Sequence, residues 1–237
     1  MSGKPCQALR IQCLNNQKQL ALSWTLYSPD NTEKLVSNGY GTPASLGDTR
    51  LWVMGGSHDV IYVETFTNTQ FLLSPDYAAF SAYLRTLDTY RCPADKSTVD
   101  AGGISVPKIR SYALNGYVGS VITAGLTANY TIFKKTSEFS SFGGSKLFIF
   151  QDTHPDSICT PMFSLRMAGD PYNGFGHYPS SSHNRGGVIV FADTHAEYHR
   201  WTDSRTVSPP LSPPYHTLAS PNNVDLDWLR ERTSLPK

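Results

Sequence analysis

The sequence predicts an α+β domain: a long N-terminal amphipathic helix packed on an antiparallel β-sheet, with long loops and a short C-terminal helix. Three observations support this prediction. Apolar residues recur at helical spacing near the N-terminus, short apolar runs separated by turn residues follow, and strands do not alternate with helices as a doubly wound sheet requires. We expect a helical segment over residues 1–30 and a globular α+β domain over residues 31–237, a length that suits one large domain.

The N-terminal helix is predicted over residues 5–28. Its apolar residues recur at spacings of three, four and seven, which places them on one stripe: Leu9, Cys13, Leu20, Trp24 and Tyr27. The polar run 15–19 is expected to lie largely on the other faces of the helix. Pro29 and the two polar residues after it predict the end of the helix.

The rest of the chain is expected to form mainly strands. Strands are predicted over residues 51–54, 60–63, 111–116 and 146–150, and the clearest hairpin joins 187–193 to 196–201. Ser74 as N-cap and Pro75 at the first helical position predict a second helix that ends near Leu87. Residues 225–232 are expected to form a closing helix with its Trp and Leu side chains facing inward.

Composition excludes several kinds of partner. The charged fraction is 16%, below the usual value of about 25%, and the net charge is +1 without a basic run. A chain of this kind is not expected to bind nucleic acid or an anionic membrane surface. No apolar stretch approaches the ~18–20 residues of a membrane span, and no secretory signal is visible.

The four cysteines, Cys6, Cys13, Cys92 and Cys159, form no CxxC pair, which argues against a metal–thiolate site and against thioredoxin-like chemistry. One disulfide, Cys13–Cys92, is compatible with an oxidising compartment. The alternative is that all four cysteines are free thiols.

Six motifs, in order along nearly the whole chain, resemble those of bacterial prepilin-type (pseudopilin-like) proteins. The exit of the long helix, Cys13 to Leu20 followed by Tyr27 to Asn31, is similar to theirs. The loop and strand motifs are Cys-Pro-Ala-Asp at 92–95, Ser-Tyr-Ala-Leu-Asn-Gly at 111–116, and His-Pro-Asp-Ser-Ile at 154–158. His183 and Asp193 match the family's His-x9-Asp-Gly signature, and residues 225–232 resemble its C-terminal tail.

This resemblance implies a class III signal peptide, an inner-membrane helix, and assembly into a type II secretion or type IV pilus-like machine. The implied partners are other pilin-like subunits or secretion-machine proteins. The implied location is extracytoplasmic (periplasmic or cell surface), with the full-length form anchored to the inner membrane through an upstream helix that this sequence lacks. Thr194 stands where the signature has Gly. A β-branched residue is poorly suited to positive φ, so we expect a different type of hairpin turn here.

One polar constellation could bind a metal ion. Its members are Asp152, His154, Asp156, His183, Asp193 and His195. Imidazoles and carboxylates together suit zinc, and carboxylates with loop carbonyls suit calcium, which some secretion pseudopilins carry in a C-terminal loop. The alternative is a purely structural role, in which His183 donates to a loop carbonyl and Asp193 caps the hairpin turn.

Three functions follow from these patterns. The first is a structural and interaction subunit, not an enzyme, whose loops contact partners or cargo. The second is a metal-dependent hydrolase that uses the His/Asp constellation, although no Gly-x-Ser-x-Gly elbow or known catalytic cysteine context is present. The third is a glycan-binding module that uses an aromatic surface formed by Tyr172, Phe175 and Tyr178. Trp52 is expected to pack in the core.

Overall fold

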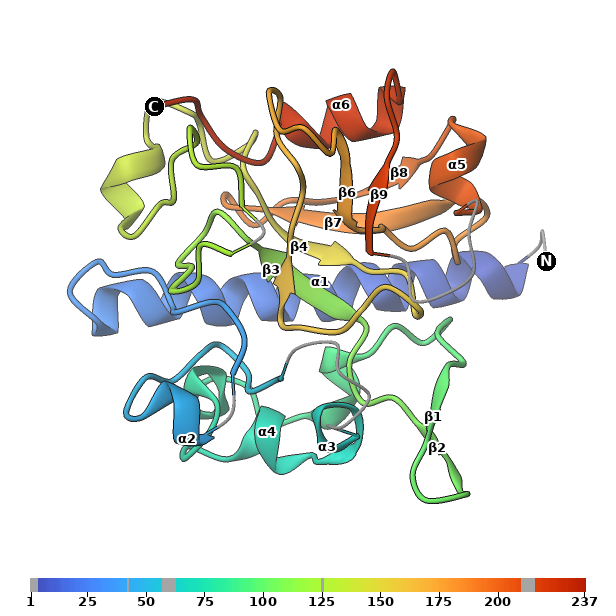
Figure 1. Cartoon of the computed structure of the whole chain (residues 1–237). Helices are drawn as coiled ribbons and strands as arrows, with labels where there is room; N and C mark the ends of the chain where they lie inside the picture. Colours follow the sequence, from blue (N-terminus) through green and yellow to red (C-terminus); the bar gives the residue numbers. More distant parts are fainter. Residues whose placement is uncertain (1–3, 42, 57–62, 125, 210–215) are drawn as a thin grey trace.

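The computed structural model describes residues 4–41, 43–56, 63–124, 126–209 and 216–237. Helix α1 (Lys4–Asp30) crosses the molecule, with the main sheet and α6 (Val224–Arg230) on one side (Figure 1). The other side holds helices α2 (Pro43–Leu46), α3 (Glu64–Thr67) and α4 (Gln70–Leu73) and the hairpin of β1 (Thr98–Asp100) and β2 (Ser105–Pro107). The helix predicted over 5–28 is confirmed. None of the described helices combines the length and apolar character that spanning a membrane requires.

The main sheet has five strands in the order β5-β3-β4-β7-β8. Its members are β3 (Tyr112–Asn115), β4 (Phe148–Asp152), β5 (Met162–Phe163), β7 (Gly186–Phe191) and β8 (Ala196–Arg200). All pairs are antiparallel except β3 with β5. A second small sheet pairs β6 (Gly174–His177) with β9 (His216–Ala219). The α+β class, the strands near 111–116 and 146–150 and the hairpin are therefore confirmed.

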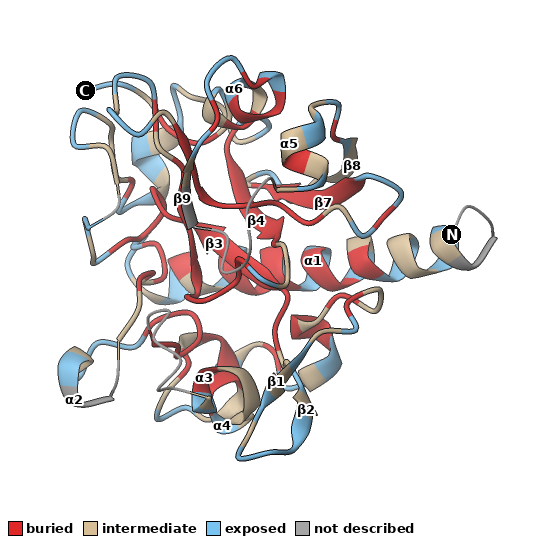
Figure 2. Ribbon diagram, turned by 45° about the vertical axis from the view of Figure 1, so that its right-hand side comes forward, coloured by how far each residue is buried: buried red, intermediate tan, exposed pale blue. Residues whose placement is uncertain are grey.

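The main sheet is buried on both faces at every strand except the edge strand β8, which explains the continuous apolar sequence of β7. Side chains alternate between the faces of a strand. Val188 and Val190 pack in the core cluster that contains the buried stripe of α1. Ile189 and Phe191 pack in a second cluster with Leu226 of α6. Figure 2 shows the sheet and the middle of α1 as the most buried parts of the molecule.

Helix α1 buries three residues of the predicted apolar stripe, leaves Leu9 and Tyr27 half-buried, and also buries two polar residues that were expected on other faces. Cys13, Leu20 and Trp24 are buried as predicted. Asn16 and Gln17 are buried as well, because both side chains find backbone partners. Gln17 Nε2 donates to the Val188 carbonyl of β7 at 2.9 Å, and Asn16 Nδ2 donates to two loop carbonyls. Such hydrogen bonds offset the cost of removing an amide from water.

The helix predicted from Ser74 to about Leu87 is wrong. The chain forms only the short helical turns α4, η1 (Ala79–Ala82) and η2 (Leu87–Tyr90). The reason is tertiary: Ala78 adopts an extended conformation and bridges to Leu51, and the amide of Ala79 donates to the Leu51 carbonyl at 2.9 Å. These contacts take the backbone groups that a continuous helix would use.

The strand predicted over 51–54 is reduced to isolated bridges. Leu51 pairs with Ser37 and Ala78 instead of belonging to a regular strand. Trp52 is fully buried in the core, as expected. The prediction for 60–63 lies outside the described residues except for Val63, which is in the turn before α3.

The β7–β8 turn contradicts the expectation for Thr194. This residue has φ of +71°, in the left-handed region that a β-branched residue was expected to avoid. The turn is held by backbone bonds from Thr194 N to the Phe191 carbonyl and from Phe191 N to the His195 carbonyl. The ladder on both sides therefore imposes the conformation on a residue that does not favour it.

We expect Thr194→Gly to raise the free energy of unfolding by about 0.5–1 kcal/mol, because glycine removes the strain of a left-handed β-branched residue but adds some unfolded-state entropy. Urea denaturation measures the change. Thr194→Val keeps the branched side chain and serves as the control, for which no gain is expected. A Thr194→Gly variant less stable than wild type would contradict the prediction.

Candidate metal centre

Four side chains from distant segments meet beneath α1. Cys13 lies on α1, Cys92 follows η2, Asp152 ends β4, and His183 lies in the loop before β7. Their ligand atoms all lie within 4.8 Å of one another, and the four residues are buried, with exposed fractions of 0–1%. Such a cluster could hold a metal ion, and no other group of three or more His, Cys, Asp or Glu side chains in the described ranges has this arrangement.

The elements that carry these residues explain why they converge. Cys13 belongs to the buried stripe of α1. Asn16, one turn later on α1, donates to the Asp88 and Arg91 carbonyls and so holds the Cys92 loop against the helix. The Asp152 carbonyl accepts a hydrogen bond of 2.7 Å from Ser180 N, which ties the end of β4 to the segment that leads to His183.

The distances within the cluster are short. Cys92 Sγ lies 3.2 Å from His183 Nε2, which lies 3.6 Å from Asp152 Oδ2. Cys13 Sγ is 3.9 Å from the same carboxylate oxygen, and the Tyr112 hydroxyl donates to Cys13 Sγ at 3.2 Å. Tyr112 therefore acts as an outer partner that orients one of the thiols.

Burial and the neighbouring groups change the acidity of the cluster. Burial, followed by the charge of Cys92, raises the pKa of Asp152 well above its usual value. Burial also raises the pKa of Cys13. The hydrogen bond from Cys13, together with that from His183, lowers the pKa of Cys92 to about 5 against the effect of burial. These hydrogen bonds thus favour a thiolate at Cys92.

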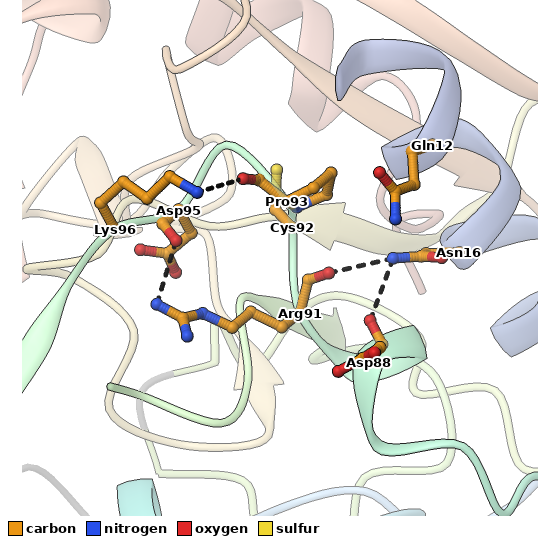
Figure 3. A pocket seen from close by; sticks show the side chains of 8 residues that line it. All are labelled: Gln12, Asn16, Asp88, Arg91, Cys92, Pro93, Asp95 and Lys96. Atoms are coloured by element: carbon orange, nitrogen blue, oxygen red, sulfur yellow. Dashed lines mark hydrogen bonds between the residues drawn. The ribbon is translucent and has the colours of Figure 1, made fainter. Parts of the chain in front are cut away.

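A cavity of about 150 Å³ lies next to the cluster, between α1 and the loop after η2 (Figure 3). Cys92 belongs to both the cavity wall and the cluster. Apart from Pro93, the rest of the wall is polar or charged and comes from Gln12, Asn16, Asp88, Arg91, Asp95 and Lys96. Cys92 therefore lies at the boundary between this cavity and the cluster.

The chain matches no protein-family model, no curated protein and no solved structure. The resemblance to prepilin-type proteins therefore remains a prediction from the sequence motifs.

The structure brings together two of the six predicted metal ligands, Asp152 and His183, and adds two cysteines. Asp193 and His195 pair with each other at the exposed β7–β8 turn, with 2.5 Å between Oδ1 and Nδ1. His154 Nδ1 accepts a hydrogen bond from Asp156 N within its own loop. These four residues are not grouped with the buried cluster.

The two added ligands were recognisable from the sequence only as a pair. Cys13 and Cys92 are the residues of the predicted disulfide, and the structure places their sulfur atoms in one cluster. Both are free thiols in this structure, as are Cys6 and Cys159. The sequence therefore suggested that the two sulfur atoms lie close together. It did not suggest that the candidate ligands Asp152 and His183 lie beside them.

A second buried thiol–imidazole contact joins Cys159 Sγ to His177 Nε2 at 3.1 Å. Ser164 N donates to His177 Nδ1 at 2.9 Å, so the proton of a neutral ring lies on Nε2. Burial raises the pKa of Cys159 to about 12. Without a third ligand among the described residues, this pair is a structural contact and not a metal site.

The predicted aromatic surface is not present as a group. Phe175 and Tyr178 are fully buried, with ring centroids 4.4 Å apart in the second core cluster. Only Tyr172 is exposed. The physical reason is that Phe175 belongs to β6, whose residues are buried throughout, so its ring packs in the interior.

Proposed function

We propose that this chain is the globular part of a pilin-like (pseudopilin) subunit, a structural and interaction protein of the extracytoplasmic space. In this proposal a segment upstream of α1 anchors the full-length form to the inner membrane. The observation that carries the proposal is an exposed apolar face on α1, on the side opposite to its buried stripe. The sequence motifs described above supply independent support.

The exposed face of α1 contains three large apolar side chains. Ile11, Leu22 and Leu26 are exposed by 57%, 56% and 48%. Spacings of eleven and four residues place them on one side of a helix, because both are close to whole numbers of turns. The face has no partner among the described residues. Leu22 and Leu26 are one turn apart, and the exposed polar residues Asn15 and Lys18 separate them from Ile11. Adjacent exposed apolar side chains are typical of a contact surface.

The partner that suits this face is the apolar helix of a neighbouring pilin-like subunit. A second helix can pack the ridges of its side chains between Ile11, Leu22 and Leu26, which is the usual geometry of helix pairs. The N-terminal turns of α1 also extend past the body of the domain in both views (Figures 1 and 2), so a second helix could approach without a clash with the sheet.

We expect the double substitution Leu22→Glu and Leu26→Glu to reduce recovery of pilin-like subunits with this protein at least tenfold, because two carboxylates would be buried in an apolar contact. The measurement is quantitative mass spectrometry after cross-linking in the native host, on the protein expressed from its own gene. Ile104→Glu, an equally exposed apolar site between β1 and β2, is the matched control. Equal recovery with both variants would remove α1 as the contact surface.

The gene upstream of this sequence provides a separate test of membrane anchoring. A prepilin-type leader and an apolar run in frame before Lys4 would support the proposal. A stop codon directly before a natural start at Met1 would remove the anchor from it.

The cluster favours this structural function over the metal-dependent hydrolase. Catalytic metal sites keep an open position for water or substrate, whereas structural sites are closed by four protein ligands. Here four ligands are supplied by the protein and all are buried. Of the two ions predicted, calcium suits the cluster poorly, because it takes about six to eight oxygen ligands and two of these four are sulfur. The predicted glycan-binding surface retains only one exposed aromatic residue, Tyr172, because Phe175 and Tyr178 are buried.

A further inference from the structure

We infer that Cys13, Cys92, Asp152 and His183 bind one zinc ion, which stabilises the fold by joining α1 to the sheet. This inference is independent of the proposed assembly function, since it concerns the interior of the domain. It assigns one common role to two thiols, a carboxyl group and an imidazole that are buried within 4.8 Å of one another.

The ligand types select zinc. Two thiolates, one imidazole and one carboxylate form a set that zinc accepts in four-coordinate structural sites. Hard ions such as magnesium and calcium prefer oxygen, and iron–sulfur clusters are usually held by four cysteines. Only two cysteines belong to this cluster.

The spacing of the ligand atoms fits a tetrahedral site. Zinc–ligand bonds of about 2.0–2.3 Å place neighbouring ligand atoms about 3.3–3.8 Å apart in a tetrahedron. Three distances in the cluster are 3.2 Å (Cys92 Sγ to His183 Nε2), 3.6 Å (His183 Nε2 to Asp152 Oδ2) and 3.9 Å (Asp152 Oδ2 to Cys13 Sγ). The other three pairs of ligand atoms lie within 4.8 Å, so binding requires side-chain movements of at most about 1 Å.

A buried carboxylate needs a cation, and this one lacks a strong partner. Buried charges in proteins are normally paired or coordinate a metal. The one ion-pair partner of Asp152 in the described part of the chain is the His183 imidazole at 3.6 Å, and no lysine or arginine pairs with it there. Thiols are weak hydrogen-bonding groups, so Cys13 and Cys92 do not replace a cation. A divalent ion bound by all four residues supplies the missing positive charge.

The position of the cluster gives the ion a structural role. Its ligands come from residues 13, 92, 152 and 183, so one ion closes several long loops of the chain. The same ion connects α1 directly to the end of β4. The polar cavity borders the cluster at Cys92 (Figure 3). Binding energy of this kind adds directly to folding stability.

The first test is the metal content of the protein purified under reducing conditions without added metal. Elemental analysis is expected to find about one zinc per chain. Cys13→Ser and Cys92→Ser should each reduce zinc at least tenfold, since a buried hydroxyl replaces a thiolate ligand. Cys159→Ser removes an equally buried thiol outside the cluster and should keep the zinc. An equivalent of a different metal, or no metal at all, would overturn the assignment.

The second test avoids variants that fail to fold, because it uses the wild-type chain. A chelator should lower the midpoint of thermal unfolding, and zinc should restore it, whereas calcium should not. Cobalt(II) added to the metal-free protein should give the visible absorption of a tetrahedral thiolate-ligated ion. An unchanged midpoint without cobalt absorption would overturn the inference. So would a Cys13–Cys92 disulfide in protein isolated from its native compartment, identified by peptide mass mapping.

The outcomes separate this inference from the proposed function. Loss of zinc in Cys13→Ser with intact cross-linking through α1 would support the metal site without bearing on assembly. A protein without zinc whose α1 face still recruits pilin-like subunits would overturn the metal site alone.

Discussion

Trp52→Ala is expected to lower the free energy of unfolding by about 3–5 kcal/mol, the usual cost of removing a large aromatic side chain from a core. Trp52 is fully buried, and its ring lies 5.0 Å from that of Phe150 and 5.7 Å from that of Phe80, between centroids. Its Nε1 donates to the Pro161 carbonyl at 3.2 Å. The substitution therefore leaves a cavity and removes one of the two hydrogen bonds to the Pro161 carbonyl, which still accepts from Leu114 N at 2.9 Å. Chemical denaturation followed by circular dichroism measures the loss.

Two further variants make this prediction specific. Trp52→Phe keeps most of the apolar volume but loses the hydrogen bond, so it should cost about 1–3 kcal/mol. Tyr172→Ala removes an exposed aromatic side chain and should change stability by no more than about 0.5 kcal/mol. Equal losses for Trp52→Ala and Tyr172→Ala would show that residues 51–54 do not lie in the core.

Asn115→Ala is expected to cost about 3–6 kcal/mol, because it leaves three buried backbone groups without their partner at about 1–2 kcal/mol each. Asn115 Nδ2 donates to the carbonyls of Phe148 and Thr233, both at 2.9 Å. Its Oδ1 accepts a hydrogen bond of 2.9 Å from Tyr117 N. One side chain thus joins β3 to β4 and to the C-terminal segment. Denaturation at equilibrium measures the effect.

Asn115→Asp tests whether hydrogen bonding, and not shape, explains the effect. The aspartate has the same size and retains an acceptor for Tyr117 N, but it directs a second oxygen at two carbonyl oxygens. We expect a loss at least as large as that of Asn115→Ala. Asn129→Ala, at an exposed asparagine, is the control and should be nearly neutral. Wild-type stability in Asn115→Asp would contradict the role of the amide.

Elements with a strong local pattern could be predicted from the sequence. The stripe that contains Cys13, Leu20 and Trp24 predicts α1, and the apolar run of β7 with the turn after it predicts the hairpin. Helix α6 also begins as its sequence suggests, since Asn223 caps the amides of Asp225 and Leu226. In each case the residues that define the element are close together in the chain.

The segment after Ser74 shows where local pattern is insufficient. Its capping residues are real signals: Ser74 Oγ accepts a hydrogen bond from Asp76 N. The extended conformation at Ala78, however, depends on Leu51, which is distant in sequence. The burial of Asn16 and Gln17 is of the same kind, because their partners lie on η2 and β7. No spacing rule within either segment contains that information.

The candidate metal centre could likewise be predicted in part from the sequence and in part only from the tertiary structure. Asp152 and His183 could be selected by residue type, and Cys13 with Cys92 could be selected as a pair of thiols. Their union in one cluster depends on how α1, the loop after η2 and the end of β4 pack together. His195 illustrates the opposite outcome: it lies two residues from Asp193 and satisfies that carboxylate locally at the surface.

By itself, the sequence determines the long helix, the hairpin and the α+β class of this protein, because periodic burial of apolar side chains is a local property. Tertiary structure alone decides which polar residues are buried and which ligands meet. Those outcomes depend on hydrogen bonds and contacts between residues far apart in the chain. The buried centre of Cys13, Cys92, Asp152 and His183 is therefore a property of the folded molecule, although each of its residues is visible in the sequence.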